Sequence, residues 1–231
     1  MNKAEKTCYM CEKLATSVEH IPPQCLFPEQ KDLPDGIDLR KQLLTVPSCD
    51  EHNSKKSQDD EYFLYSLVML INSNKVARNQ YFSKIKRAIK RNPSLLKKFT
   101  DASSPVKMQN SQTGAISNTR AFHLDEDRFN GIIDRLGRAL YYKHFNEKCY
   151  NHIKYQAEYL LATIDPKNSY ELNKPIQETS EQADGWFSNS KYYGENPEVF
   201  KYQVLEGNQS KIMRLHFYKG NRLLLIFKQN S

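Results

Sequence analysis

The sequence predicts an α+β fold in which a small metal-centred module is followed by a helical segment and a C-terminal antiparallel β region. Metal-ligand residue types are paired within the first 53 positions. Apolar residues then recur at helical spacing, and alternating segments separated by a short turn occupy the C-terminal end. We expect two parts, a module over residues 1–75 and a helical plus β part over residues 76–231.

Composition limits the class of protein. The 231 residues are enough for one large domain or two small ones, and a hydrophobic fraction of 39% with a mean hydropathy of −0.76 describes a polar chain. The net charge of +7 and the pI near 9.0 favour a polyanionic partner. The start lacks the apolar stretch of a signal peptide, and the longest apolar run, residues 62–71, is about half of a membrane span. We therefore expect a cytoplasmic protein without a membrane segment.

Cysteine usage indicates metal binding rather than disulfide bonds. The five cysteines are an odd number, and four of them lie within the first 49 residues. Cys8-x2-Cys11 and Cys49-x2-His52 have the spacing of a four-ligand zinc site in which two turns supply two ligands each. His52 could instead serve a second site. The other two cysteines have no partner at ligand spacing and are interpreted as ordinary thiols.

The N-terminal segment is poor in helical periodicity. Two short β-type pieces are expected at residues 15–20 and 43–46, with a loop rich in Pro, Asp and Lys over residues 27–40. Ser48 and Asp50 are N-cap candidates for a helix that begins beside the second ligand pair. The expected order around the metal is strand, loop, strand and helix.

Helical patterns follow. Residues 62–70 predict a largely buried helix, and Phe82, Ile85 and Ile89 predict one apolar face of a second helix. A third helix is clear over residues 129–140.

The remaining segments give weaker signals. A short piece is expected at residues 93–99, and residues 103–118 are polar enough to predict a loop. Strands are expected at 199–205, 211–218 and 222–227, the last two joined by a hairpin turn. The segment 165–196 is ambiguous, and its only tryptophan, Trp186, is interpreted as a packing anchor.

Between and beside the ligand pairs lie Glu19-His20-x-x-Pro23 and Asn53-x-x-Lys56. With the ligand pairs they resemble the HNH endonuclease motif and its flanking zinc ligands, and more closely a group of uncharacterised bacterial HNH proteins. The motif region spans residues 8 to about 63. The resemblance implies a zinc-stabilised ββα-metal module, with structural Zn²⁺ on the ligands Cys8, Cys11, Cys49 and His52.

The resemblance also implies roles in phosphodiester hydrolysis. His20 would be the general base, because a neutral imidazole with a pKa of about 6.5 can accept a proton from water. Glu19 and Asn53 would bind Mg²⁺ or Mn²⁺ through oxygen atoms. Since strand alternation directs Glu19 and His20 to opposite sides, a bulge or a strand end is required there, and Pro22 and Pro23 are consistent with an end.

The chain departs from the family pattern at three positions. The fourth zinc ligand is His52 where the commoner residue is Cys. The middle polar residue of the motif, usually Asn, is not obvious, although Gln42 can substitute for it. The acid at position 19 is Glu rather than the also common Asp, which lengthens its reach to the metal.

The function that follows is a divalent-metal-dependent endonuclease acting on nucleic acid, with double-stranded DNA as the expected substrate and anti-phage defence as a hypothetical setting. Residues 76–231 would supply DNA positioning, dimerisation or regulation through a protein partner. The alternative is a non-catalytic zinc module that binds nucleic acid or protein. Basic side chains near and downstream of the motif are the candidate nucleic-acid contacts: Lys56, Lys84, Arg87, Lys90 and Arg91.

Overall fold

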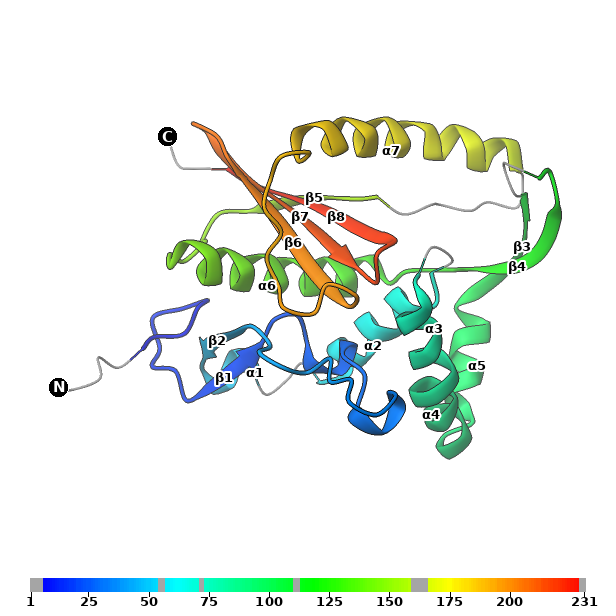
Figure 1. The fold of residues 1–231 in the computed structure, drawn as a ribbon, viewed down its shortest axis with the longest axis horizontal. Coiled ribbons are helices and arrows are strands. Elements are labelled where there is room, and N and C mark those ends of the chain that lie inside the picture. Colours follow the sequence, from blue (N-terminus) through cyan, green and yellow to red (C-terminus); the bar gives the residue numbers. More distant parts are fainter. Residues whose placement is uncertain (1–5, 54–56, 71–72, 110–112, 159–165, 229–231) are drawn as a thin grey trace.

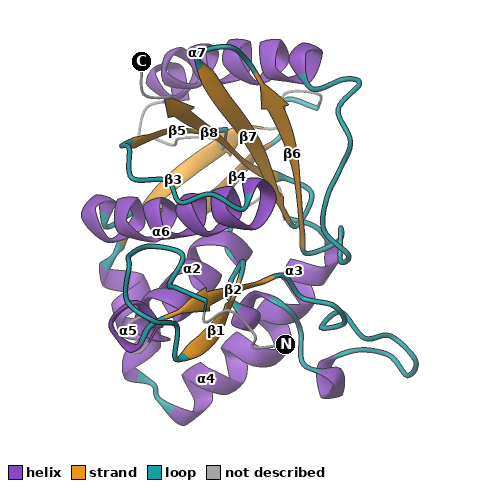
Figure 2. Cartoon of the chain, turned by 90° about the vertical axis from the view of Figure 1, so that its left-hand side faces the viewer, coloured by secondary structure: helices purple, strands orange, loops and turns teal. Residues whose placement is uncertain are grey.

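The computed structural model describes residues 6–53, 57–70, 73–109, 113–158 and 166–228. The structure is mixed α+β, and an antiparallel sheet lies between two long helices (Figure 1). The N-terminal segment with the metal-ligand residues lies on the far side of one of these helices, away from the sheet (Figure 2). Among the described residues, no helix combines the length and apolar character needed to cross a bilayer.

The N-terminal segment contains the predicted order of elements. Strand β1 (Ser17–His20) pairs with strand β2 (Thr45–Ser48) in an antiparallel ribbon, and helix α1 (Asp50–Asn53) follows. The second strand lies two residues later than predicted. The connection between the strands contains two short 3₁₀ turns, η1 (Gln24–Leu26) and η2 (Gln30–Asp32).

The helical segment begins with α2, whose apolar residues are almost all buried as predicted, although the helix ends at Val68 and not at residue 70. A single rod then runs through α3, a π-helical turn η3 and α4, and α5 follows after Pro93. The asparagine before the rod, Asn74, caps it by accepting a hydrogen bond from the backbone N–H of Ala77 at 3.1 Å. The bounds are α2 (Ser57–Val68), α3 (Lys75–Gln80), η3 (Tyr81–Ile85), α4 (Lys86–Arg91) and α5 (Ser94–Asp101).

The π-turn changes the phase of this rod. Its i→i+5 hydrogen bonds accommodate one extra residue, so side chains on either side of the turn no longer follow the 3.6-residue repeat. Ile85 is fully buried and Ile89 half-buried, but Phe82 is 61% exposed, and the ammonium group of Lys86 lies 4.5 Å from its ring centroid. The predicted apolar face was therefore right for the isoleucines and wrong for Phe82.

A hairpin replaces the loop predicted at residues 103–118. Strand β3 (Ser103–Gln109) pairs with β4 (Ile116–Phe122) (Figure 1). Strand β4 is largely exposed, whereas β3 buries Ser103 and Val106. The guanidinium of Arg120 donates to Ser103 Oγ at 2.8 Å and to the carbonyl of Thr100 at 3.1 Å, which ties the hairpin to α5. Apolar burial is limited to β3 around Val106, and the exposed strand β4 gives the segment no continuous apolar pattern that would identify a hairpin.

Helix α6 (Glu126–Phe145) confirms the third predicted helix. Asp125 caps its start by accepting from the backbone N–H of Arg128, and Asn146 ends it in a left-handed conformation with φ 56°. Gly137 lets the sheet approach closely, because a Cβ atom there would lie 2.9 Å from Ile153 Cδ1.

The four-stranded sheet contains the three predicted C-terminal strands and one strand that was not predicted. Its order is β5-β8-β7-β6, with all neighbours antiparallel. Tyr218 and Lys219 have positive φ values of 47° and 65° in the predicted turn between β7 and β8. The bounds are β5 (Ile153–Ala157), β6 (Phe200–Glu206), β7 (Ser210–Phe217) and β8 (Asn221–Lys228).

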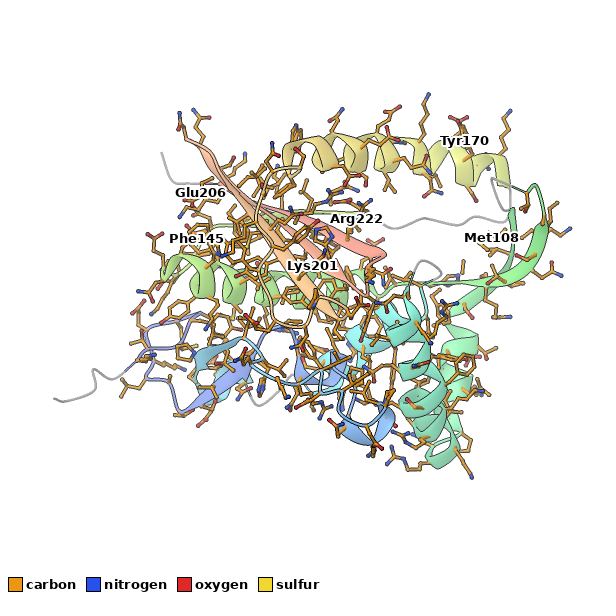
Figure 3. All side chains as sticks on the ribbon, in the orientation of Figure 1. Met108, Phe145, Tyr170, Lys201, Glu206 and Arg222 are labelled. Carbon is orange, nitrogen blue, oxygen red and sulfur yellow. The ribbon has the colours of Figure 1, made fainter. Side chains whose placement is uncertain are left out.

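The two faces of the sheet differ in chemistry. The α6 face is apolar and joins one hydrophobic core that extends from Cys8 to Phe227, across the predicted division at residue 75. Helix α7 (Pro166–Trp186) covers the other face through a small apolar cluster and through charged residues, with Arg222 lying between helix and sheet (Figure 3). Trp186 is 52% exposed, so its interpretation as a packing anchor was wrong.

His216 is a buried titratable group on the α7 face. Its Nε2 donates to Gln203 Oε1 at 3.2 Å, because the amide nitrogen of Gln203 is already used toward the carbonyls of Phe187 and Ser190. Burial, reinforced by the positive charges of Arg214 and other nearby cations, lowers the pKa of His216 to about 3. The folded protein therefore holds this imidazole neutral.

We expect acid to destabilise the fold through His216. Between the unfolded pKa of about 6.5 and the folded pKa of about 3, the unfolded state binds a proton that the folded state does not, so stability falls as the pH falls. From pH 7 to pH 5 the wild type should lose about 2 kcal/mol more than His216→Gln, measured by urea unfolding. Equal losses in the two proteins would contradict this assignment.

Candidate metal centre

Four side chains from two separate turns converge in the N-terminal module. Cys11 Sγ and Cys49 Sγ lie 3.8 Å apart, and His52 Nδ1 lies 3.5 Å from Cys8 Sγ, 3.6 Å from Cys11 Sγ and 3.2 Å from Cys49 Sγ. A tetrahedral zinc ion, with Zn–S of about 2.3 Å and Zn–N of about 2.0 Å, separates its ligand atoms by roughly 3.5 to 3.8 Å. The four side chains form a cluster that can hold a metal ion such as zinc.

Local hydrogen bonds shape both ligand turns. The N–H of Cys8 donates to the carbonyl of Lys13 at 2.8 Å and closes the first turn. After β2, the N–H groups of His52 and Asn53 donate to the carbonyl of Cys49 at 3.1 and 3.0 Å, which brings the imidazole back beside the Cys49 sulfur. His52 therefore belongs to the cysteine cluster and not to a second site.

The surroundings of Cys8 and Cys11 shift the pKa values of the two thiols in opposite directions. Burial opposes ionisation of Cys8, but hydrogen bonds from backbone N–H groups, that of Met10 first, bring its pKa below the ordinary value. For Cys11, burial and the neighbouring thiols of Cys49 and Cys8 raise the pKa. A bound cation favours the thiolate form, so metal binding releases protons from such a cluster.

The second predicted group comes from β1 and α1. Glu19 is 6% exposed and faces the interior, whereas strand alternation directs His20 to the opposite side. Asn53 Nδ2 donates to Ser17 Oγ at 2.8 Å, and Ser17 is on the same side of β1 as Glu19. The pairing of β1 with β2 has no bulge, and the strand ends at His20. The structure thus brings Asn53 to the Glu19 side and leaves His20 at the strand end.

Tyr9 is a residue of this region that neither ligand spacing nor apolar periodicity singles out. It follows the ligand Cys8 directly, its side chain is fully buried, and its hydroxyl lies beside the Glu19 carboxylate without a well-formed hydrogen bond. Burial and the Glu19 charge raise the pKa of Tyr9, and Arg135 of α6 acts in the opposite direction. The only signal in the sequence was its position inside the first ligand turn.

Comparisons with protein-family models, curated proteins and solved structures find no match to this chain. Within the described ranges, the only group of three or more His, Cys, Asp or Glu side chains close enough to hold a metal ion is the cysteine–histidine cluster. The resemblance to HNH endonucleases stays a prediction.

Two of the predicted nucleic-acid contacts make internal bonds. Lys84 donates to the carbonyl of Cys25 at 3.0 Å, and burial lowers its pKa. Arg87 forms a bidentate pair with Asp32, at 2.6 and 2.7 Å. Both side chains bond the connection between β1 and β2 to the helical rod, so they have a structural role whether or not nucleic acid binds.

The other predicted contacts have different surroundings. Lys90 and Arg91 are exposed at the end of α4. Lys56 lies outside the described residues. Gln42, the candidate for the middle polar residue, is exposed and has a positive φ of 51°.

Proposed function

We propose that the protein is a divalent-metal-dependent HNH endonuclease that hydrolyses phosphodiester bonds in double-stranded DNA. The observation that carries the proposal is the cysteine–histidine cluster, which joins the turn before β1 to the start of α1. The same connection holds the side chain of Asn53 against the strand that carries Glu19 and His20. The order of elements and the residue types agree with the ββα-metal arrangement.

The donor chemistry on this side of β1 suits a hard cation. Glu19 and Asn53 are the residues that would hold Mg²⁺ or Mn²⁺, and the buried hydroxyl of Tyr9 beside Glu19 is a suitable partner for a water molecule of a hydrated ion. Such an ion, when bound, neutralises charge on the phosphoryl oxygens and on the leaving oxygen. His20 would take the proton from the attacking water at its imidazole nitrogen.

A plasmid assay tests this function. Supercoiled DNA incubated with the protein and Mg²⁺ or Mn²⁺ should become nicked or linear, and His20→Ala should reduce the rate by about 10²- to 10⁴-fold, the usual contribution of a general base. His152→Ala, which alters an exposed histidine after α6, is the matched control and should cleave at the wild-type rate. Equal product from wild type and His20→Ala would exclude the enzymatic role.

The alternative is a non-catalytic zinc module that binds nucleic acid or protein. The burial of Glu19 favours it, because a residue that is only 6% exposed contributes to packing in the interior of the module whether or not a cation binds. In that case the cluster ligands are needed for folding and binding, while Glu19, His20 and Asn53 are not. A protein that binds DNA, contains zinc and cleaves nothing with either cation would favour this second function.

A further inference from the structure

Positive charge is concentrated in one segment of the chain. Residues 75–124 contain eleven Lys and Arg residues and a single acidic residue, Asp101, whereas the rest of the chain has more acidic than basic residues. The segment corresponds to the rod from α3 to α4, to α5 and to the β3–β4 hairpin. The overall charge of the protein is therefore a local property of this region.

Part of this charge has a structural use. Lys84 and Arg87 hold the connection between β1 and β2, and Arg120 joins the hairpin to α5 through the carbonyl of Thr100. These side chains are oriented by carbonyl or carboxylate partners. These internal bonds account for three of the eleven basic residues in the segment, and no ligand is needed to explain them.

The other eight basic side chains of the segment are exposed and form no ion pair with a carboxylate in the described part of the chain, and five of them lie on α4 and α5. Lys86 and Lys90 are also four residues apart on one helix, a like-charge spacing that destabilises a helix by a few tenths of a kcal/mol. Such a surface gains stability when a polyanion neutralises it. We call these residues the α4–α5 cationic surface: Lys86, Lys90, Arg91, Lys97 and Lys98.

We propose that the α4–α5 cationic surface binds the sugar–phosphate backbone of a DNA duplex. The two helices pack side by side at the end of the molecule away from β5–β8 (Figures 1 and 2). The Lys86 ammonium group lies 4.5 Å from the ring centroid of Phe82, so one face of this exposed ring is occupied by a positive charge instead of being open to an unpaired base.

The surface is fixed with respect to the proposed catalytic strand. The connection that leaves His20 passes through Cys25 and Asp32, and both contact the rod, through Lys84 and Arg87 respectively. A duplex bound on α4–α5 would therefore keep a fixed position relative to β1. This use of the surface depends on the proposed function, but its binding to DNA can be measured without cleavage.

Salt-dependent binding tests the proposal. Fluorescence anisotropy would follow the full-length protein on a DNA duplex of about 20 base pairs, roughly two helical turns, without added Mg²⁺ or Mn²⁺. Lys86→Gln/Lys90→Gln and Lys97→Gln/Lys98→Gln should each raise Kd roughly tenfold and lower the slope of log K against log salt by about 1.8. Lys143→Gln/Lys154→Gln removes the same charge from exposed positions on α6 and β5 and should leave the slope unchanged.

The outcomes separate this proposal from the proposed function. Equal slope changes in the surface and control variants would mean that only net charge matters, and would overturn the assigned surface. A wild-type protein that does not bind the duplex would also overturn it. Cleavage that depends on His20, with unchanged slopes in both surface variants, would support the proposed nuclease function and contradict DNA binding by the α4–α5 cationic surface. Altered slopes in a protein that cleaves nothing would support DNA binding by this surface and contradict the nuclease function.

Discussion

Replacing Cys49 by serine should unfold the N-terminal module and lower the stability of the whole chain. Structural zinc sites contribute about 10–16 kcal/mol of apparent binding free energy in small peptides, which is comparable to the total stability of about 5–15 kcal/mol for a typical domain. Cys8 and Cys49 are buried within the common core, so the loss of one ligand removes packing as well as a metal bond. Zinc content by metal analysis and Tm by circular dichroism should fall together.

The destabilisation should extend beyond the ligands. Lys148, after α6, donates to the carbonyl of Cys11 at 2.8 Å and pairs with Glu12 at 3.0 Å. Lys148 therefore bonds the first ligand turn to the segment that directly follows α6, the helix that supports the sheet. Hydrogen exchange should show lost protection at the end of α6 as well as in β1 and β2.

Cys25→Ser is the matched control. Cys25 lies outside the cluster and donates a hydrogen bond from its thiol to the carbonyl of Asp60 at 3.2 Å, which a serine hydroxyl can replace. This variant should keep its zinc and most of its stability. A Cys49→Ser protein with full zinc and an unchanged Tm would refute the assignment of Cys49 as a ligand.

The metal cluster was predictable because its information is local. Two pairs at x2 spacing each fix a turn, and the metal accepts only a narrow range of ligand distances, so the pattern implies the geometry. Periodicity likewise identified α2, α6 and the β7–β8 hairpin, which bury continuous apolar faces. Neither ligand spacing nor periodicity singles out Tyr9, whose position beside Glu19 depends on contacts between separate chain segments.

The errors have physical causes that a single sequence does not reveal. The π-turn in the rod inserts a residue into the repeat, and this turned Phe82 outward. Strand β4 is almost entirely exposed and β3 buries only a short apolar stretch around Val106, so residues 103–118 were interpreted as a loop. Lys84 and Arg87 were predicted as surface contacts because their carbonyl and carboxylate partners are more than 50 residues away.

Replacing Arg214 by leucine should destabilise the protein by about 3–5 kcal/mol, because it breaks a buried ion pair and leaves a carboxylate without its main partner. Arg214 is fully buried between β7 and α7, and its guanidinium donates to Glu158 at 2.9 and 2.6 Å and to Asp184 at 2.6 Å. The side chain of Glu158 is completely inaccessible to solvent. Urea unfolding at pH 7 measures the loss.

A double-mutant cycle decides whether the charge or the volume is responsible. Arg214→Leu/Glu158→Leu removes both members of the pair and leaves Arg222 and Asp184, which are 3.1 Å apart, to balance each other. Because well-packed apolar side chains can replace a buried pair at little cost, the double variant should be more stable than Arg214→Leu alone. If the double variant instead loses the sum of the two single effects, the residues act independently and α7 is held by packing rather than by this pair.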